Sequence, residues 1–188
     1  NSKIIPIPIG NWTVDNGILS QVDNEVHWTP GQAGEYSLHV VDSDVPASIN
    51  VEVMHGSADV TRLVPSQSSV SAGVQMALVH EAMDSFGNVW QIEANITQTD
   101  GVFASVDIFA SYVSVMPKQI ESLGFSANYL DPSTGVLHES QWTDEILPGR
   151  LAFIELPESG TEVAADSYLE FNPLFMDAYE NIIPYVAV

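Results

Sequence analysis

Two copies of one short motif carry the side chains with the clearest chemical potential. The motif is an aspartate and an asparagine four residues apart with an aromatic residue between them, as Asp84-Ser-Phe-Gly-Asn88 and Asp177-Ala-Tyr-Glu-Asn181. Such side chains close turns by hydrogen bonding to nearby backbone groups. Carboxylates also bind calcium, and Asp84 could share an ion with Asp59 and Asp107. No EF-hand loop or repeated Asp-x-Asp pattern occurs, so we interpret Asp84 and Asn88 as closing a turn, expect no cofactor, and keep calcium as the alternative.

The histidines and serines form no recognisable catalytic set. His80-Glu81 and His138-Glu139 are adjacent pairs, but neighbouring residues of a strand point to opposite faces of the sheet. Neither His-x-His nor His-Glu-x-x-His spacing occurs, and no serine lies in Gly-x-Ser-x-Gly. We therefore predict no catalytic residue and no enzyme activity. All five histidines are interpreted as structural or surface residues: His27, His39, His55, His80 and His138.

The tryptophans and two Asn-x-Thr patterns are the remaining candidates for ligand contact. Exposed tryptophans would suit sugar stacking, but an alternating strand around Trp90 favours core packing. Asn11 and Asn95 begin Asn-x-Thr patterns and are candidate glycosylation sites. They occupy equivalent positions of an internal repeat, so repetition alone also explains them. The tryptophans are Trp12, Trp28, Trp90 and Trp142.

The composition restricts the classes of partner. The 188 residues include 25 acidic and 4 basic side chains, for a net charge of −21 at pH 7 with neutral histidines. Nucleic acid and anionic membrane surfaces both require a basic face, so neither is expected as a partner. No apolar run approaches the roughly 18–20 residues of a membrane span. The chain has no cysteine, which excludes disulfides and thiol chemistry.

The motif belongs to an internal repeat of about 90 residues, long enough for a domain with its own core. The two motif copies lie 93 residues apart, and Val64-Pro65 recurs as Leu156-Pro157 after 92 residues. We predict the C-terminal half of one unit in residues 1–56, a complete unit in 57–148 and the N-terminal half of another in 149–188. A free half sandwich would expose an apolar face and open strand edges. The halves are therefore expected to complete each other, within one chain or between copies.

Alternation of apolar and polar residues predicts antiparallel strands. In the complete unit we predict strands near 60–64, 74–83, 89–97, 124–130 and 136–142, with two short strands within 102–115. Short strands separated by turns about every 8–12 residues are typical of an all-β Greek-key sandwich. The predicted core comprises Val74, Met76, Leu78, Trp90, Ile92, Ile96, Phe125 and Ala127.

Two features connect this pattern to a family. Gly34-Glu-Tyr36 resembles a tyrosine corner, in which the phenol hydroxyl bonds upstream backbone; Phe125 takes this position in the next unit and can only pack. The Asp-x-Phe/Tyr-Gly-Asn turn between two strands resembles tandem bacterial and archaeal immunoglobulin-like repeats of the invasin/intimin type (Big domains). The third unit has Glu180 where this turn needs glycine, so its turn could differ, because positive φ is unfavourable for glutamate.

The resemblance implies a non-catalytic, extracellular segment of a cell-surface protein, acting as a stalk or adhesin. Its partners would be neighbouring immunoglobulin-like repeats, of the same protein or another copy, and a surface protein or glycan. Two alternatives stay open. One is a carbohydrate-binding β-sandwich appended to a secreted enzyme, which should present coplanar tryptophans on one face. The other is a filament or surface-layer subunit that shares strands between chains.

Overall fold

The chain folds into antiparallel β-sheets, which confirms the predicted all-β class. The computed structural model describes residues 11–22, 25–41, 47–156, 162, 164–168 and 172–184. These residues contain no helix, and therefore no helix able to cross a membrane. Contacts along the chain define two compact units, Asn1–Val60 with Met83–Trp90, and Thr61–Ala82 with Gln91–Val188.

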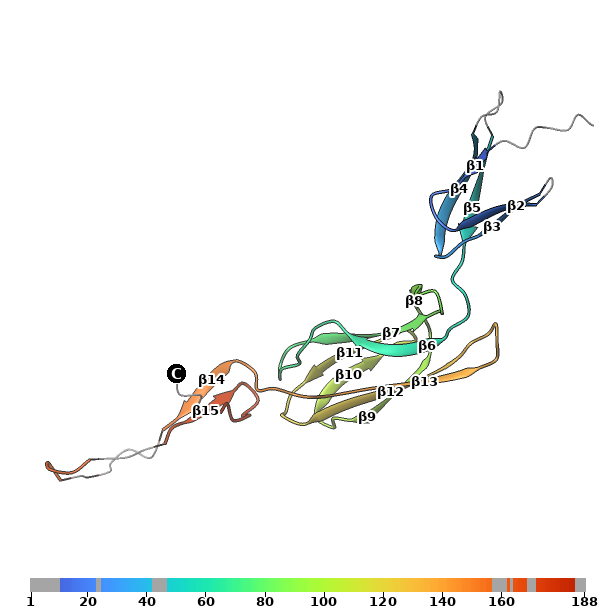
Figure 1. The fold of residues 1–188 in the computed structure, drawn as a ribbon. Helices are drawn as coiled ribbons and strands as arrows, with labels where there is room; N and C mark the ends of the chain where they lie inside the picture. The colour runs from blue at the N-terminus through green and yellow to red at the C-terminus, as the bar shows by residue number, and fades with distance from the viewer. Residues whose placement is uncertain are drawn as a thin grey trace, which may run out of the picture. The chain divides into compact units, whose positions relative to one another are not determined.

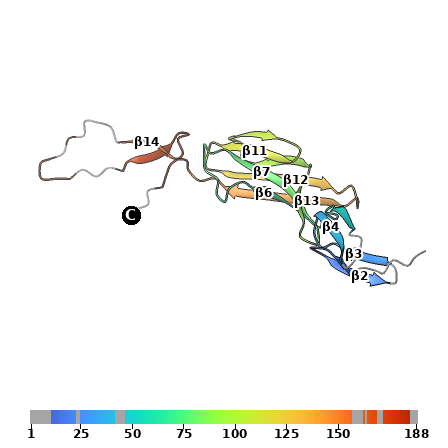
Figure 2. The same ribbon diagram turned by 90° about the horizontal axis from the view of Figure 1, so that it is seen from above.

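Two facing sheets form a sandwich in the middle of the chain (Figures 1 and 2). One sheet has the order β10-β11-β7-β6 and the other β13-β12-β9. Lettered A to G along the chain, these are the D-E-B-A and C-F-G sheets of a constant-type immunoglobulin sandwich. The strands are β6 (Val60–Pro65), β7 (Met76–Met83), β9 (Asn95–Asp100), β10 (Ala104–Ile108), β11 (Tyr112–Pro117), β12 (Ser122–Leu130) and β13 (Leu137–Glu145).

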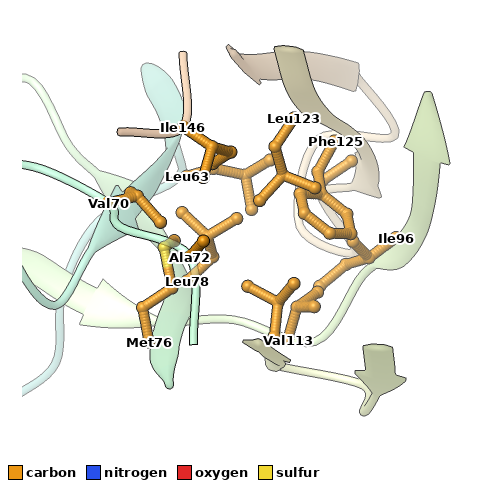
Figure 3. Packing of buried hydrophobic residues seen from close by; sticks show 12 residues of the cluster. Leu63, Val70, Ala72, Met76, Leu78, Ile96, Val113, Leu123, Phe125 and Ile146 are labelled. Atoms are coloured by element: carbon orange, nitrogen blue, oxygen red, sulfur yellow. The ribbon is translucent and has the colours of Figure 1, made fainter. Parts of the chain in front are cut away.

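The core lies between the two sheets, as their alternation predicts. Along β7 every second residue is buried, so Met76 and Leu78 face the other sheet. Phe125 and Ala127 of β12 are fully buried opposite them. Figure 3 shows Met76, Leu78 and Phe125 meeting in one interior with Leu63, Val113, Leu123 and Ile146. Burial of each large apolar side chain contributes roughly 1.5–3 kcal/mol.

The predictions that Val74 and Trp90 belong to the core are wrong. Val74 is 42% exposed because it belongs to the turn before β7, where its N–H bonds the Ser71 carbonyl. Trp90 is half-buried and lies outside the core cluster. The predicted strand 89–97 is broken: β8 (Val89–Gln91) pairs with β7, and only β9, after the break, pairs with β12. Trp90 precedes this change of sheet, whereas Ile96 follows it and is buried.

The N-terminal residues repeat the later half of the sandwich. One sheet has the order β1-β4-β5, which matches β9-β12-β13, and β2-β3 forms a hairpin like β10-β11. The hydroxyl of Tyr36 donates to the carbonyl of Gln32 at 3.0 Å, which confirms the tyrosine corner. The strands are β1 (Asn11–Thr13), β2 (Ile18–Val22), β3 (Glu25–Thr29), β4 (Gly34–Val41) and β5 (Ser48–Val53).

The C-terminal residues repeat the beginning of the sandwich. Strands β14 (Leu151–Glu155) and β15 (Leu174–Asp177) pair in antiparallel fashion, as β6 and β7 do. Within the predicted half unit 149–188, residues 157–161, 163, 169–171 and 185–188 lie outside the described residues. The domain boundaries after residues 56 and 148, and completion of the half units within or between chains, stay predictions.

Candidate functional site

Asp84 directly follows β7, and its carboxylate accepts four hydrogen bonds. Oδ1 accepts from the backbone N–H groups of Phe86 at 2.9 Å and Asn88 at 3.0 Å. Oδ2 accepts from the Asn88 side-chain amide at 2.7 Å and from the Gly56 N–H at 2.8 Å. Because Asp84 is only 2% exposed, these donors replace its water. The carboxylate therefore closes its own turn and holds Gly56, which lies in the linker, the segment between β5 and β6.

The hydrogen bonds stabilise the charged form of this carboxylate. Burial alone would raise the pKa of Asp84, since desolvation disfavours the anion. The hydrogen bonds from the Asn88 side chain and from the N–H groups of Gly56, Asn88 and Phe86 outweigh burial and lower the pKa to about 2. Asp84 is consequently ionised at neutral pH, with its charge directed at protein donors.

The second motif copy has the same geometry. Asp177 accepts from the N–H groups of Tyr179 at 2.8 Å and Asn181 at 3.0 Å, and from the Asn181 side chain at 2.8 Å. The two backbone N–H groups bond Oδ1, and the N–H of Gly149 donates at 2.7 Å to Oδ2, which also accepts from the Asn181 side chain. Burial would raise the pKa of Asp177, but these hydrogen bonds lower it. In both copies the linker glycine precedes the aspartate by 28 residues.

The expectation that Glu180 could alter the turn is wrong. Glu180 adopts φ 65°, close to the φ of 82° at Gly87, which holds the same position in the first copy. The left-handed conformation costs a non-glycine residue roughly 1–2 kcal/mol. The hydrogen bonds to Asp177 hold the turn despite this cost, because they are charge-assisted and buried.

The asparagine of each turn also forms hydrogen bonds with a loop far away in the sequence. Asn88 Oδ1 accepts from the N–H of Ala33 at 2.8 Å, in the loop before β4. Asn181 Oδ1 accepts from the N–H of Ile120 at 3.1 Å, and its Nδ2 donates to the Lys118 carbonyl at 2.8 Å, in the loop before β12. Since β4 and β12 are equivalent strands, both turns join the same two places of the repeat. The sequence predicted the turn but not this connection, which needs the fold.

The fold of the described residues brings together no set of ligands for the calcium ion considered as an alternative. Among the described residues, no three His, Asp or Glu side chains are placed to hold a metal ion. Asp84 is therefore not gathered with Asp59 and Asp107 into one site, and its oxygens are occupied by N–H donors. The absence of a required cofactor stays a prediction.

His80 is the histidine with an unusual environment. It is fully buried, and its Nε2 lies 3.0 Å from Oγ of Ser140. Within the described part of the chain, Nδ1 has no hydrogen-bond partner. A serine and a base at this distance suggest nucleophilic catalysis, but the pair is enclosed, and no described residue bonds Nδ1 to orient the imidazole. Burial lowers the pKa of His80, which favours the neutral ring, and its structural role stays a prediction. Its place at an inward position of β7 was the signal in the sequence.

The tryptophans are all half-buried, and three have defined partners. Trp28 donates its Nε1–H to the Asn16 carbonyl at 2.8 Å. Trp90 stacks on His55 with ring centroids 3.6 Å apart. Trp142 packs against the sandwich core.

The two Asn-x-Thr patterns differ in what can be described. Asn95 and Thr97 are exposed on β9, while Ile96 between them faces the core. The strand thus presents the acceptor amide and the threonine on one open face. Asn11 begins β1, but its side chain lies outside the described residues. Glycosylation at both positions stays a prediction.

Comparisons with known proteins give structural likeness only. No family model matches the chain, and no curated protein matches it in sequence. InvD of Yersinia pseudotuberculosis has a TM-score of 0.45 at 14% identity, over 92% of this chain and 61% of that one. Domains 4–9 of the surface layer protein SbsC have a TM-score of 0.34 at 18% identity, over 98% of this chain and 30% of that one. The chain thus spans less than two thirds of either protein.

Proposed function

We propose that this chain is a non-catalytic segment of tandem immunoglobulin-like repeats that serves as an extracellular stalk or adhesin on a cell surface. One observation carries the proposal. The residues that recur between repeats join distant segments of the chain, as in the bonds from Asp84 to Gly56 and from Asn88 to Ala33. A repeat whose recurring polar residues bond distant segments to each other suits a protein that extends from a surface and spaces its domains. Its partners are neighbouring repeats and a surface protein or glycan, and neither membrane insertion nor nucleic acid binding is part of the proposal.

The packing of the tryptophans favours this function over a sugar-binding module. A sugar platform needs an open aromatic face. Trp28 contacts Tyr36 edge-on, and one face of Trp90 is covered by His55. Trp142 lies against the core near Phe125. These three rings therefore pack against neighbouring residues of the chain, as expected for a structural role.

Surface labelling tests the proposed location. Antibodies raised against the purified chain are applied to intact cells of the source organism and to permeabilised cells, with a ribosomal protein as the internal control. We expect labelling of intact cells while the ribosomal protein stays unlabelled. Labelling that requires permeabilisation would overturn the extracellular assignment.

A second candidate, a subunit that shares strands between copies, is favoured by the apolar surface of β14. Leu151, Phe153 and Ile154 are each more than half exposed. In the sandwich, by contrast, the equivalent hairpin β6-β7 covers the core with Leu63 and Leu78. The β14-β15 hairpin of one copy would complete the N-terminal half unit of another.

Light scattering of the 188-residue chain over a range of concentrations tests this second candidate. Strand sharing predicts a molar mass that rises with concentration and a loss of association in Ile154→Lys. Leu130→Lys is the matched control, because Leu130 is 61% exposed on the complete sandwich. A chain that stays monomeric throughout rules strand sharing out.

A further inference from the structure

The two copies of the turn differ in where their aromatic ring lies. Phe86 is 65% exposed, whereas Tyr179 is half-buried and packs against the sandwich core. Gly73 makes room for Tyr179, since a Cβ added there would lie 2.8 Å from Cε2 of the ring. Non-bonded carbons in contact normally keep about 3.5–4.0 Å. The space above Gly73 is therefore filled by Tyr179.

Polar backbone groups beside Gly73 complete the same surface. The Gly73 N–H donates to the Pro117 carbonyl at 2.8 Å, which fixes the glycine against the end of β11. The next residues offer a carbonyl at Lys118 and an N–H at Ile120, and both are engaged by the Asn181 carboxamide. A carboxamide can donate and accept at once, which an ionised carboxylate cannot do. The surface thus fits a ring and an amide together.

We propose that this end of the sandwich, defined by Gly73, Lys118 and Ile120, is a docking site for the Asp-x-aromatic-x-Asn turn of the repeat that follows. Its occupant in this chain is the turn Asp177–Asn181. The first copy supports the rule, because Asn88 bonds the equivalent loop at Ala33. This inference rests on the proposed function as a run of linked repeats, and it adds the recognition chemistry: a ring over glycine and an amide on a backbone carbonyl and N–H.

Hydrogen exchange at the Ile120 N–H measures docking directly, because its acceptor is Asn181. In the full chain we expect Gly73→Ala and Tyr179→Ala each to speed this exchange at least tenfold. The matched control is Gly135→Ala: Gly135 has φ 71° beside φ 77° at Gly73, but a Cβ there meets nothing within 4 Å. It therefore carries the backbone strain without the clash and should leave Ile120 protected. Tyr179→Phe should also leave the exchange unchanged, since it keeps the ring carbons that fill the space above Gly73.

A motif exchange tests whether the surface recognises the turn itself. The triple variant Ala178→Ser, Tyr179→Phe, Glu180→Gly gives the second turn the sequence of the first, and we expect unchanged or slower exchange at Ile120. Docking is overturned if Tyr179→Ala leaves Ile120 protected, or if Gly73→Ala and Gly135→Ala have equal effects. Loss of protection in the motif exchange would overturn recognition of the shared motif. These results come from the purified chain and do not depend on the cell-surface experiment, so the two proposals can fail separately.

Discussion

The two Asp-x-aromatic-x-Asn turns share their polar chemistry and differ in the residue at the left-handed position and in the surroundings of the aromatic ring. Both aspartates accept the same set of N–H donors, at 2.7–3.0 Å. One copy has glycine at the left-handed position and an exposed ring; the other has Glu180 and a packed ring. The comparison teaches that the carboxylate and carboxamide define the turn, whereas the ring and the glycine depend on the neighbourhood.

Removing either carboxylate should have the largest effect. Asp84→Ala and Asp177→Ala leave buried N–H groups without an acceptor, and hydrogen bonds to charged groups contribute about 1.5–3 kcal/mol each, though not additively. We expect each variant to lower the free energy of unfolding by about 3 kcal/mol in urea denaturation. Asp107→Ala, exposed on β10, is the control and should stay within about 0.5 kcal/mol. A negligible loss at Asp177 alone would break the equivalence of the turns.

Acid should weaken both turns below about pH 4, because both aspartates have a lowered pKa. The folded pKa of Asp84 is lowered from 3.8 to about 2 and that of Asp177 is lowered too, so the unfolded chain binds protons first. The stabilisation from Asp84 is complete above about pH 4 and is lost as pH falls toward 2, and that from Asp177 is lost as pH falls below 4 through its lowered pKa. The total effect of acid should be smaller than that of deleting the carboxylates. Comparing unfolding of the wild type and Asp84→Asn between pH 5 and 2 checks this. A pH slope unchanged by the substitution would contradict it.

The sandwich core should respond to acid in a different window. Burial lowers the folded pKa of His80 below 6.5, so the unfolded state takes up the proton more readily. The stabilising contribution is complete above pH 6.5 and is lost as pH falls below it. The melting temperature of the wild type should therefore decrease between pH 7 and 5 more than that of His80→Gln. His39, an exposed residue, provides the control in His39→Gln.

The smallest effect should come from the residue at the left-handed position. Glu180→Gly removes the strain of φ 65° and should stabilise the chain by about 1 kcal/mol. Gly87→Glu should destabilise by a similar amount, because φ there is 82°. Thermal unfolding of the two variants measures both changes. If both substitutions shift the melting temperature in the same direction, the two positions are not equivalent.

Local patterns predicted most strands because a strand with one buried face alternates in sequence. The alternation along β7 and β12 and the hydroxyl bond of Tyr36 followed directly. The position of Trp90 outside the core could not be predicted from the alternation. The change of sheet within the predicted strand depends on contacts such as the hydrogen bond from the Ile92 N–H to the His80 carbonyl. The turn at Asp84 was visible from its own residues. The bond from Asn88 to Ala33 joins residues 55 apart and has no local signal.

The distance of these bonds along the chain has a consequence for vectorial synthesis. A chain that emerges from its N-terminus presents Ala33 long before Asn88, the residue that engages it. In the same way Lys118 and Ile120 appear more than 60 residues ahead of Asn181. Each of these loops is therefore bonded only after part of the next repeat has left the ribosome. In such an array, each loop would meet its asparagine only after about two thirds of a repeat more has been synthesised.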